Sequence, residues 1–116
     1  MKITTLVLIL ISSLFLIGCT NNNQTQKEEI MQIMKENEYV MIDVRTKEEY
    51  DTSHIQDAIN IPYNEIDETI NIDKTKVVLV YCQSGNRSKM AYNTLTSLGY
   101  QTYDLGAMSQ IDLPKE

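Results

Sequence analysis

Several residue types are scarce in this chain of 116 residues, and their scarcity excludes whole classes of function. The chain has one histidine, His54, and its two cysteines form no Cys-x-x-Cys pair. This argues against a structural metal site, because such a site needs several Cys or His ligands. The formal net charge is −6, and an acidic exterior argues against nucleic acid and against a polybasic membrane-binding surface. We therefore expect no metal, no cofactor and no nucleic-acid partner.

The apolar stretch near the start of the sequence is shorter than a typical transmembrane helix. The apolar stretch from Ile3 to Ile17 has 15 residues, fewer than the roughly 20 that a helix needs to cross a bilayer. It follows Lys2 and ends at the small residue Gly18, which is typical of a secretory signal. Cys19 comes next, so the segment resembles the lipobox of bacterial lipoproteins. That resemblance implies cleavage before Cys19 and attachment of a lipid to it. An uncleaved anchor, or an ordinary signal followed by an incidental cysteine, is the alternative.

This assignment divides the chain into three parts. We expect a signal peptide over residues 1–18, a lipidated cysteine with a flexible polar linker over residues 19–26, and one folded domain over residues 27–116. A domain of this length can bury a modest core. The protein would then lie in the cell envelope, lipid-anchored through Cys19 on the extracytoplasmic side of a bacterial membrane.

Apolar patterns of strand and helix type alternate along residues 27–116. The expected helices cover residues 27–38, 46–50, 63–70 and 88–98, with a short helical tail after the last strand. The expected strands cover residues 39–44, 58–61, 77–81 and 101–105. The continuous apolar runs at 39–44 and 77–81 are typical of parallel strands buried on both faces. The alternation predicts a small α/β domain with a central parallel sheet of four to five strands flanked by helices.

Cys82 is the residue whose position has the clearest chemical meaning. It follows the apolar run from Val77 to Tyr81, and a helical pattern begins a few residues later. Parallel sheets bind ligands at such a junction, where unpaired backbone amides and the helix dipole attract anions. The same field favours thiolate over thiol, and the thiolate is the nucleophile. We therefore predict that Cys82 is a reactive cysteine, rather than a merely buried thiol or a disulfide partner of Cys19.

The loop that follows Cys82 has a composition suited to holding an anion. Gly85 allows the backbone to approach a ligand closely, and successive loop amides can form an anion-binding nest. Arg87, at Cys-x4-Arg spacing, can hold an oxyanion in its guanidinium fork and lower the pKa of the thiol. These parts would stabilise a sulfur anion without a neighbouring acid or histidine. That suits a reaction whose leaving group needs no proton.

Taken together, these residues resemble the single-domain rhodaneses, which are thiosulfate or persulfide sulfurtransferases. The resemblance runs from about Lys27 to Pro114 and is far more specific than Cys-x4-Arg alone. Its matching segments are Ile42-Asp43-Val44-Arg45, Glu49-Tyr50, His54-Ile55, Ala58-Ile59-Asn60-Ile61-Pro62, Tyr81-Cys82-Gln83-Ser84-Gly85-Asn86-Arg87-Ser88, Ala91, Leu95, Leu98-Gly99-Tyr100 and Tyr103-Asp104-Leu105-Gly106.

The resemblance implies a sulfur transfer in two steps. The Cys82 thiolate would attack the outer sulfur of a small anionic donor such as thiosulfate and release sulfite. A thiol or cyanide acceptor would then remove the sulfur from the Cys82 persulfide, and such covalent catalysis gives ping-pong kinetics. Arg87 would orient the anionic donor. The persulfide would rest among the loop amides, those of Gln83, Ser84, Gly85, Asn86 and Arg87.

Four residues depart from the family pattern. Ser53 and Asp57 stand where the family usually has glycine, Ala107 replaces the second glycine of a Gly-Gly pair, and Ile111 falls near the customary tryptophan. All four lie outside the catalytic loop. They therefore put the substrate preference in doubt more than the class of reaction.

Charged and polar residues near the other strand ends are expected to support the site. We interpret Asp43 and Arg45 as structural residues that hold neighbouring loops, rather than as catalytic groups. His54 is expected to be a hydrogen-bonded structural residue. Glu49 is expected in the first turn of a short helix, where the dipole favours it, with Arg45 as its candidate partner.

Rival functions fall into two groups. A cysteine-based phosphatase or arsenate reductase on the same fold would use Cys-x5-Arg, whose longer ring admits a tetrahedral oxyanion, whereas this chain has Cys-x4-Arg. The other group comprises a persulfide carrier without turnover, a binding module and a thiol redox protein at the cell envelope. A two-cysteine redox cycle is weakened by the lack of a resolving cysteine.

Overall fold

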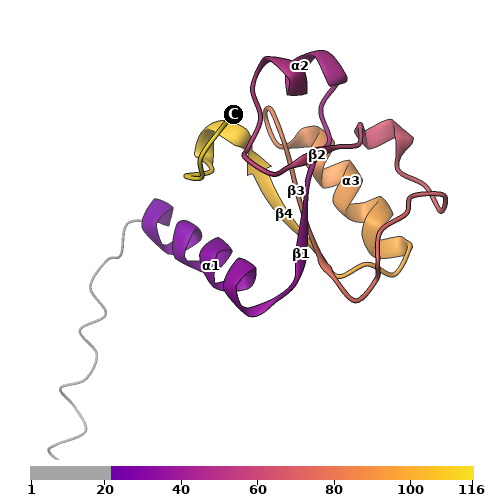
Figure 1. Cartoon of the computed structure of the whole chain (residues 1–116), viewed down its shortest axis with the longest axis horizontal. Helices are drawn as coiled ribbons and strands as arrows, with labels where there is room; N and C mark the ends of the chain where they lie inside the picture. The colour runs from indigo at the N-terminus through magenta and orange to yellow at the C-terminus, as the bar shows by residue number, and fades with distance from the viewer. Residues whose placement is uncertain (1–21) are drawn as a thin grey trace, which may run out of the picture.

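The computed structural model describes residues 22–116, which form a four-stranded sheet with helices on both faces (Figure 1). All the strands are parallel, and their order is β2-β1-β3-β4. The strands are Tyr39–Asp43 for β1, Ile59–Asn60 for β2, Val77–Cys82 for β3 and Thr102–Ala107 for β4. The predicted α/β class and parallel sheet are therefore confirmed, with four strands.

Strand β3 lies at the centre of this sheet, between β1 and β4, and every one of its residues is buried. Successive side chains of a strand point to opposite faces, so β3 contributes to two separate cores. On one face the side chains are those of Val77, Leu79 and Tyr81. On the other face they are those of Val78, Val80 and Cys82. The continuous apolar run in the sequence is what a strand buried on both faces requires.

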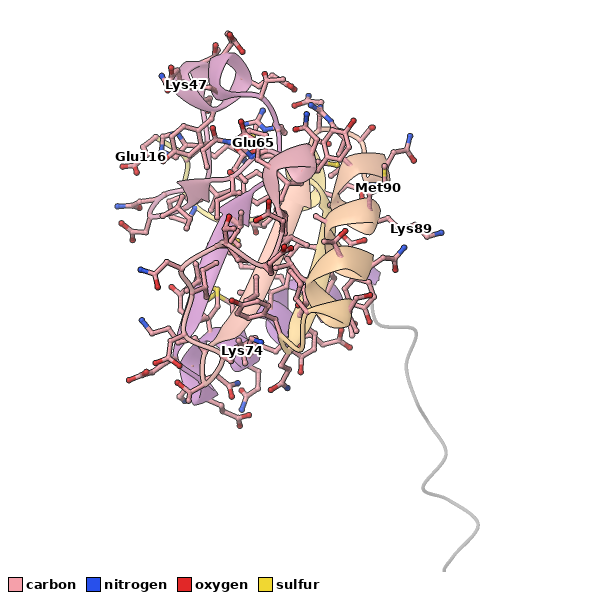
Figure 2. The ribbon with its side chains drawn as sticks, turned by 90° about the vertical axis from the view of Figure 1, so that its right-hand side faces the viewer. Lys47, Glu65, Lys74, Lys89, Met90 and Glu116 are labelled. Carbon is pink, nitrogen blue, oxygen red and sulfur yellow. The ribbon has the colours of Figure 1, made fainter. Side chains whose placement is uncertain are left out.

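Two long helices cover the two faces of the sheet. Helix α1, Asn22–Glu36, contributes Ile30 to the first core, and helix α3, Asn86–Ser97, contributes Ala91 and Leu95 to the second. In Figure 2 the side chain of Lys89 projects from the outer surface of α3, away from the sheet. Full burial of a leucine such as Leu95 contributes about 1.5–3 kcal/mol to folding.

The short helix α2, Lys47–Thr52, follows β1 and begins where its first residues satisfy each other's hydrogen bonds. The Thr46 hydroxyl accepts a hydrogen bond from the Glu49 amide, and the Glu49 carboxylate accepts one from the Thr46 amide, both at 3.3 Å. This reciprocal arrangement is a capping box. It fixes the position of the Glu49 side chain at the start of α2.

One expectation about local structure is wrong. Residues 63–70 do not form a helix, because only the 3-10 turn η1, Tyr63–Glu65, is helical. The Asp67 carboxylate accepts hydrogen bonds from the amide of Thr69 at 2.8 Å and from its hydroxyl at 2.5 Å. Local side-chain bonds of this kind compete with the backbone bonds of a helix.

The ends of the predicted domain also differ from the sequence-based expectation. Helix α1 begins at Asn22, so residues 22–26 of the expected linker are helical, since extending a formed helix adds one hydrogen bond per residue. The expected helical tail is the 3-10 turn η2, Met108–Gln110. The predicted signal peptide, residues 1–18, and the predicted lipid attachment at Cys19 lie outside the described residues. From residue 22 to residue 116, no helix has the length and apolar character needed to cross a membrane.

The backbone at Asp57 explains one departure from the family pattern. Its φ is +68°, in the left-handed region that glycine enters freely and that Asp tolerates better than most residues. The Asp57 amide donates to a Glu116 carboxylate oxygen at 3.3 Å, which holds the turn beside the end of the chain. Glycine is the residue that this backbone favours, and Asp57 fills the position at some conformational cost.

We predict that Asp57→Val lowers the free energy of unfolding by roughly 1–2 kcal/mol, because a β-branched residue is strained at positive φ. Asp57→Gly should stay within about 1 kcal/mol of the parent protein. Denaturant unfolding measures both, with exposed Gln56→Val as a control that should change stability by less than about 0.5 kcal/mol. Equal stabilities of the Val and Gly variants would contradict the role given to the backbone.

Candidate active site

The structure places Cys82 at the junction of strand and helix that the sequence predicted. It is the last residue of β3, and α3 begins at Asn86. The helix therefore starts two residues before the expected Ser88, which shortens the loop and brings the first helical amides towards the cysteine. The Cys82 thiol is free and fully buried. The backbone of Cys82 pairs with Ala107 of β4, so that the departure at position 107 lies directly beside the nucleophile.

The thiol is bound by the backbone that follows it. The Gly85 amide donates a hydrogen bond to Cys82 Sγ over 3.0 Å. Gly85 is the N-cap residue of α3 and has a φ of +102°, a conformation that residues with a Cβ rarely adopt. A glycine at this position therefore allows the chain to turn back and aim an amide at the sulfur.

Two opposing effects set the acidity of Cys82. Burial alone would raise the pKa of its thiol, because a buried thiolate loses its hydration. Hydrogen bonds to the sulfur from the side chain and amide of Ser88, and from the amides of Gly85 and Ser84, outweigh burial and lower the pKa below the ordinary value. A lower pKa makes the thiolate, which is the nucleophilic form, more abundant at a given pH.

Ser88 is a site residue to which the sequence analysis gave no role. It is fully buried, and its hydroxyl lies 3.1 Å from the carbonyl oxygen of Gly85. A hydroxyl carries a single proton, so when Ser88 donates to the Cys82 sulfur, the contact that lowers the pKa of the thiol, it does not donate to this carbonyl. The available signal was a serine in the first turn of a helix, where side-chain hydroxyls bond nearby groups.

Arg87, predicted from the sequence to orient the anionic donor, already holds a carboxylate in its guanidinium fork. Its Nη1 and Nη2 donate to the two carboxylate oxygens of Glu49 at 2.7 and 3.1 Å. The expected pairing of Glu49 with Arg45 is therefore wrong. The Arg45 guanidinium is already bound by the buried carboxylate of Asp43, whereas that of Arg87 reaches Glu49.

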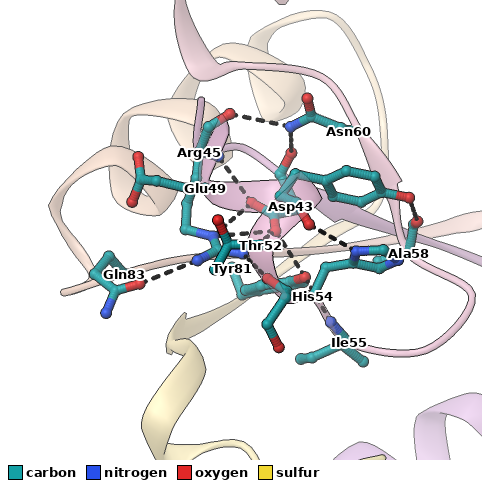
Figure 3. A network of polar contacts seen from close by, with 12 residues as sticks. Asp43, Arg45, Glu49, Thr52, His54, Ile55, Ala58, Asn60, Tyr81 and Gln83 are labelled. Carbon is teal, nitrogen blue, oxygen red and sulfur yellow. Dashed lines mark hydrogen bonds and ion pairs between the residues drawn. The ribbon is translucent and has the colours of Figure 1, made fainter. Parts of the chain in front are cut away.

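Asp43 and Arg45 form a buried ion pair at the end of β1 (Figure 3). Arg45 Nη2 lies 2.7 Å from Asp43 Oδ2, and Arg45 Nε donates to both carboxylate oxygens. The remaining donors reach two other segments, with Nη2 to the Ser53 carbonyl at 2.6 Å and Nη1 to Gln83 Oε1 at 3.1 Å. The pair thus connects the end of β1, the loop after α2 and the loop that carries the nucleophile.

Tyr81 joins the same network from the neighbouring strand (Figure 3). Its hydroxyl donates to Asp43 Oδ2 at 2.9 Å and accepts from the Ile55 amide at 3.0 Å. Asn60 of β2 donates to the backbone carbonyls of Asp43 and Arg45, each at 3.0 Å. Buried ions are costly unless all their polar atoms are satisfied, and this network satisfies them. Asp43 and Arg45 thus join several segments of the chain, and their structural role stays a prediction.

His54 also makes contacts of a structural kind. Its Nδ1 lies 2.8 Å from the Tyr50 carbonyl oxygen, and its ring stacks on that of Tyr50 with centroids 3.7 Å apart. Its Nε2 lies 3.3 Å from a carboxylate oxygen of Glu116. The backbones of His54 and Glu116 exchange two further hydrogen bonds. His54 therefore ties the end of the chain to the loop after α2.

Comparison with known proteins adds an independent finding. Residues 26–108 match the family described as "Rhodanese-like domain". The chain is 41% identical over 78 residues to "Thiosulfate sulfurtransferase PspE" of Escherichia coli (strain K12), covering 64% of this chain and 75% of that one. It is 31% identical over 74 residues to "Thiosulfate sulfurtransferase GlpE" of Coxiella burnetii (strain RSA 331 / Henzerling II), covering 63% and 69%. A structure described as "rhodanese with anions from E. coli" superimposes with a TM-score of 0.63 at 39% identity, over 67% of this chain and 96% of that chain.

The Tyr81 hydroxyl can be tested by deletion. We predict that Tyr81→Phe lowers the free energy of unfolding by about 1–3 kcal/mol, because the Ile55 amide loses its acceptor in a buried site. Thermal or denaturant unfolding measures the effect. Tyr103→Phe removes the same atom from an exposed tyrosine and should change stability by less than about 0.5 kcal/mol. Equal effects of the two changes would show that the buried network contributes little.

The hydrogen bonds to Cys82 make a prediction about pH. Since they lower the pKa of the thiol, Ser88→Ala should raise it, so that the thiolate forms only at a higher pH than in the parent protein. A titration of thiolate ultraviolet absorbance measures this, with Cys82→Ser as the blank. Ser97→Ala, which removes a hydroxyl from the far end of α3, should leave the titration unchanged. A Ser88→Ala curve that coincides with the parent curve would contradict the assignment.

Proposed function

The chain belongs to the rhodanese-like domain family, and we propose on this basis that it is a sulfurtransferase whose nucleophile is Cys82. The observation that carries the proposal is the buried Cys82 sulfur, which accepts a hydrogen bond from the Gly85 amide at the start of α3. A thiol held in this way is stabilised as the anion. These contacts stabilise the thiolate through backbone amides and a hydroxyl, without a charged partner on the sulfur.

The first half of the reaction transfers one sulfur atom to the enzyme. The Cys82 thiolate attacks the outer sulfur of thiosulfate, a new S–S bond forms, and the bond between the two sulfurs of thiosulfate breaks. Sulfite leaves with the electron pair of the broken bond, and the enzyme carries the negative charge on the terminal sulfur of its persulfide. Because sulfite departs as an anion, this step needs no general acid, which agrees with a site that places no titratable acid on the sulfur.

The second half returns the enzyme to its starting state. The attacking atom of a thiolate or cyanide acceptor takes the terminal sulfur, and Cys82 leaves as the thiolate. Between the two steps the persulfide anion is held by amides of the loop from Gln83 to Arg87, of which those of Ser84 and Gly85 already stabilise the Cys82 sulfur. The two half-reactions share one covalent intermediate, so the kinetics should be ping-pong.

The choice of substrates is supported by the relatives. PspE and GlpE are both named thiosulfate sulfurtransferases, and the E. coli rhodanese structure contains anions by its description. These names support a small anionic sulfur donor and a thiol or cyanide acceptor for this chain. The shorter Cys-x4-Arg ring also favours sulfur transfer over hydrolysis of a phosphate ester.

The proposed location rests on the sequence alone. The apolar segment followed by Gly18 and Cys19 supports a lipid-anchored protein on the extracytoplasmic side of a bacterial membrane. Helix α1 begins three residues after Cys19, so the folded domain would lie close to the membrane surface. Metabolic labelling with a fatty acid tests this, since Cys19→Ala should abolish incorporation while Cys82→Ser should not.

A loading assay tests the proposed reaction. We predict that the reduced protein gains the mass of one sulfur atom when incubated with thiosulfate, and that it releases thiocyanate with turnover when cyanide is added. Cys82→Ser should lose both by more than about 100-fold, because the mutation removes the nucleophile.

The pattern of results separates the rival functions. Loading without turnover would indicate a persulfide carrier that awaits a specific partner. Failure of both thiosulfate and an organic persulfide to load Cys82 would contradict the sulfurtransferase and favour a binding or redox role. Cys82-dependent hydrolysis of an aryl phosphate would instead support a phosphatase.

A further inference from the structure

The Glu49 carboxylate occupies the guanidinium fork that an anionic donor would use. Its two oxygens accept hydrogen bonds from Arg87 Nη1 and Nη2 at 2.7 and 3.1 Å, a bidentate geometry of the kind that guanidinium groups make with oxyanions. The side chains are only partly buried, with 27% of Arg87 and 32% of Glu49 exposed. The contact therefore lies where a ligand from solvent can meet it.

Glu49 is held in this position by its own helix as well as by Arg87. Its Oε1 also accepts hydrogen bonds from the amide and the hydroxyl of Thr46, at 3.3 and 3.1 Å. Arg87, followed by these contacts with Thr46, lowers the pKa of Glu49 to about 2 against the opposing effect of burial. The carboxylate thus stays ionised across the pH range in which a thiolate can react.

The second guanidinium near the loop is neutralised in a similar way. Arg45 contacts Gln83 of the loop, but its charge is paired with the buried Asp43 at 2.7 Å. Both arginines that adjoin the Cys82 loop are consequently matched by a carboxylate. Attraction of an anion to this loop is left to neutral groups, namely the loop amides and the first turn of α3.

A donor with two negative charges meets a specific disadvantage in this arrangement. To use the Arg87 fork it must displace Glu49, and if it binds beside the fork it lies next to an ionised carboxylate. A donor with one negative charge, carried on the sulfur that enters the amide cradle, does not need the fork. The cost of the extra charge is electrostatic, so it depends on distance and ionic strength.

We propose that Glu49 is a specificity-determining positioning residue, which acts through Arg87 to disfavour dianionic sulfur donors relative to monoanionic donors such as thiosulfonates and organic persulfides. The inference rests on the proposed sulfurtransferase function and adds the charge class of the donor. It also accounts for a glutamate in the capping box of α2 that bonds more strongly across the site than within its own helix.

The test compares two donors that share a sulfonyl sulfur and differ by one charge. Thiosulfate carries two negative charges, whereas methanethiosulfonate has a methyl group in place of one charged oxygen. We measure kcat/KM of each donor with the parent protein and with Glu49→Gln, which keeps the size and hydrogen-bonding capacity of the side chain but removes its charge. The ratio of kcat/KM for thiosulfate over methanethiosulfonate should rise about tenfold, mainly through a lower KM for thiosulfate.

Glu48→Gln is the matched control. Glu48 lies in the same first turn of α2, and its replacement by Gln changes the net charge by the same amount as Glu49→Gln. Among the contacts that the structure records, the Glu48 side chain has no hydrogen bond or ion pair with Arg87. The donor ratio of this variant should stay within about twofold of the parent value, because exposed charges act weakly over longer distances. In Glu49→Gln, added salt should also change the donor ratio less than it does in the parent protein.

Three results would overturn the inference. An unchanged donor ratio in Glu49→Gln would show that the charge of Glu49 does not select the donor. An equal loss of activity with both donors would show that Glu49 only supports the fold, and Glu49→Ala repeats the comparison if the glutamine variant does not fold. A parent protein that accepts sulfur from neither donor would instead overturn the proposed function itself, and the inference with it.

Discussion

The buried ion pair between Asp43 and Arg45 is the interaction on which the arrangement of the active-site edge depends. Four segments meet at it: the end of β1, the loop after α2 through Ser53, strand β3 through Tyr81, and the catalytic loop through Gln83. A buried charge without a partner is strongly destabilising, so each segment that supplies a hydrogen bond is held firmly in place. The pair defines the edge of the sheet at which Cys82 lies without touching the nucleophile itself.

Because side chains alternate along β3, the structural network and the nucleophile lie on opposite faces of the sheet. Tyr81 and Cys82 are consecutive, and consecutive residues of a strand face opposite sides of the sheet. Tyr81 therefore enters the network of Asp43 on the α1 side, while Cys82 faces α3 and receives the amide of Gly85. Fixing the tyrosine on one face fixes the position of the cysteine on the other, because the backbone between them is part of the central strand.

The nucleophile is stabilised mainly by dipoles rather than by full charges. Backbone amides and the Ser88 hydroxyl lower the pKa of Cys82 in spite of its burial, whereas Arg87 and Arg45 are each bound to a carboxylate. Preorganised dipoles stabilise an anion in a dry site without attracting every anion from solvent. The electrostatics of the loop therefore bear on the choice of donor. A cradle of neutral dipoles binds a single sulfur anion, and a second negative charge on the donor adds little to the binding free energy.

The sequence alone predicted the features of this protein that depend on residues adjacent in the chain. The apolar run ending at Cys82, Gly85 in the loop and the helical pattern after it predicted the parallel sheet and the strand–helix junction, because strand burial, loop conformation and helix start depend on neighbouring residues. The helix predicted over residues 63–70 does not form, because the Asp67 carboxylate accepts the hydrogen bond of the Thr69 amide in place of a helical carbonyl. The composition of this segment did not reveal that alternative. The sequence did not predict which charged residues would pair with one another. Glu49 and Arg87 are 38 residues apart. Only the tertiary fold decided that they would meet, because an ion pair forms between groups that the fold brings together in space.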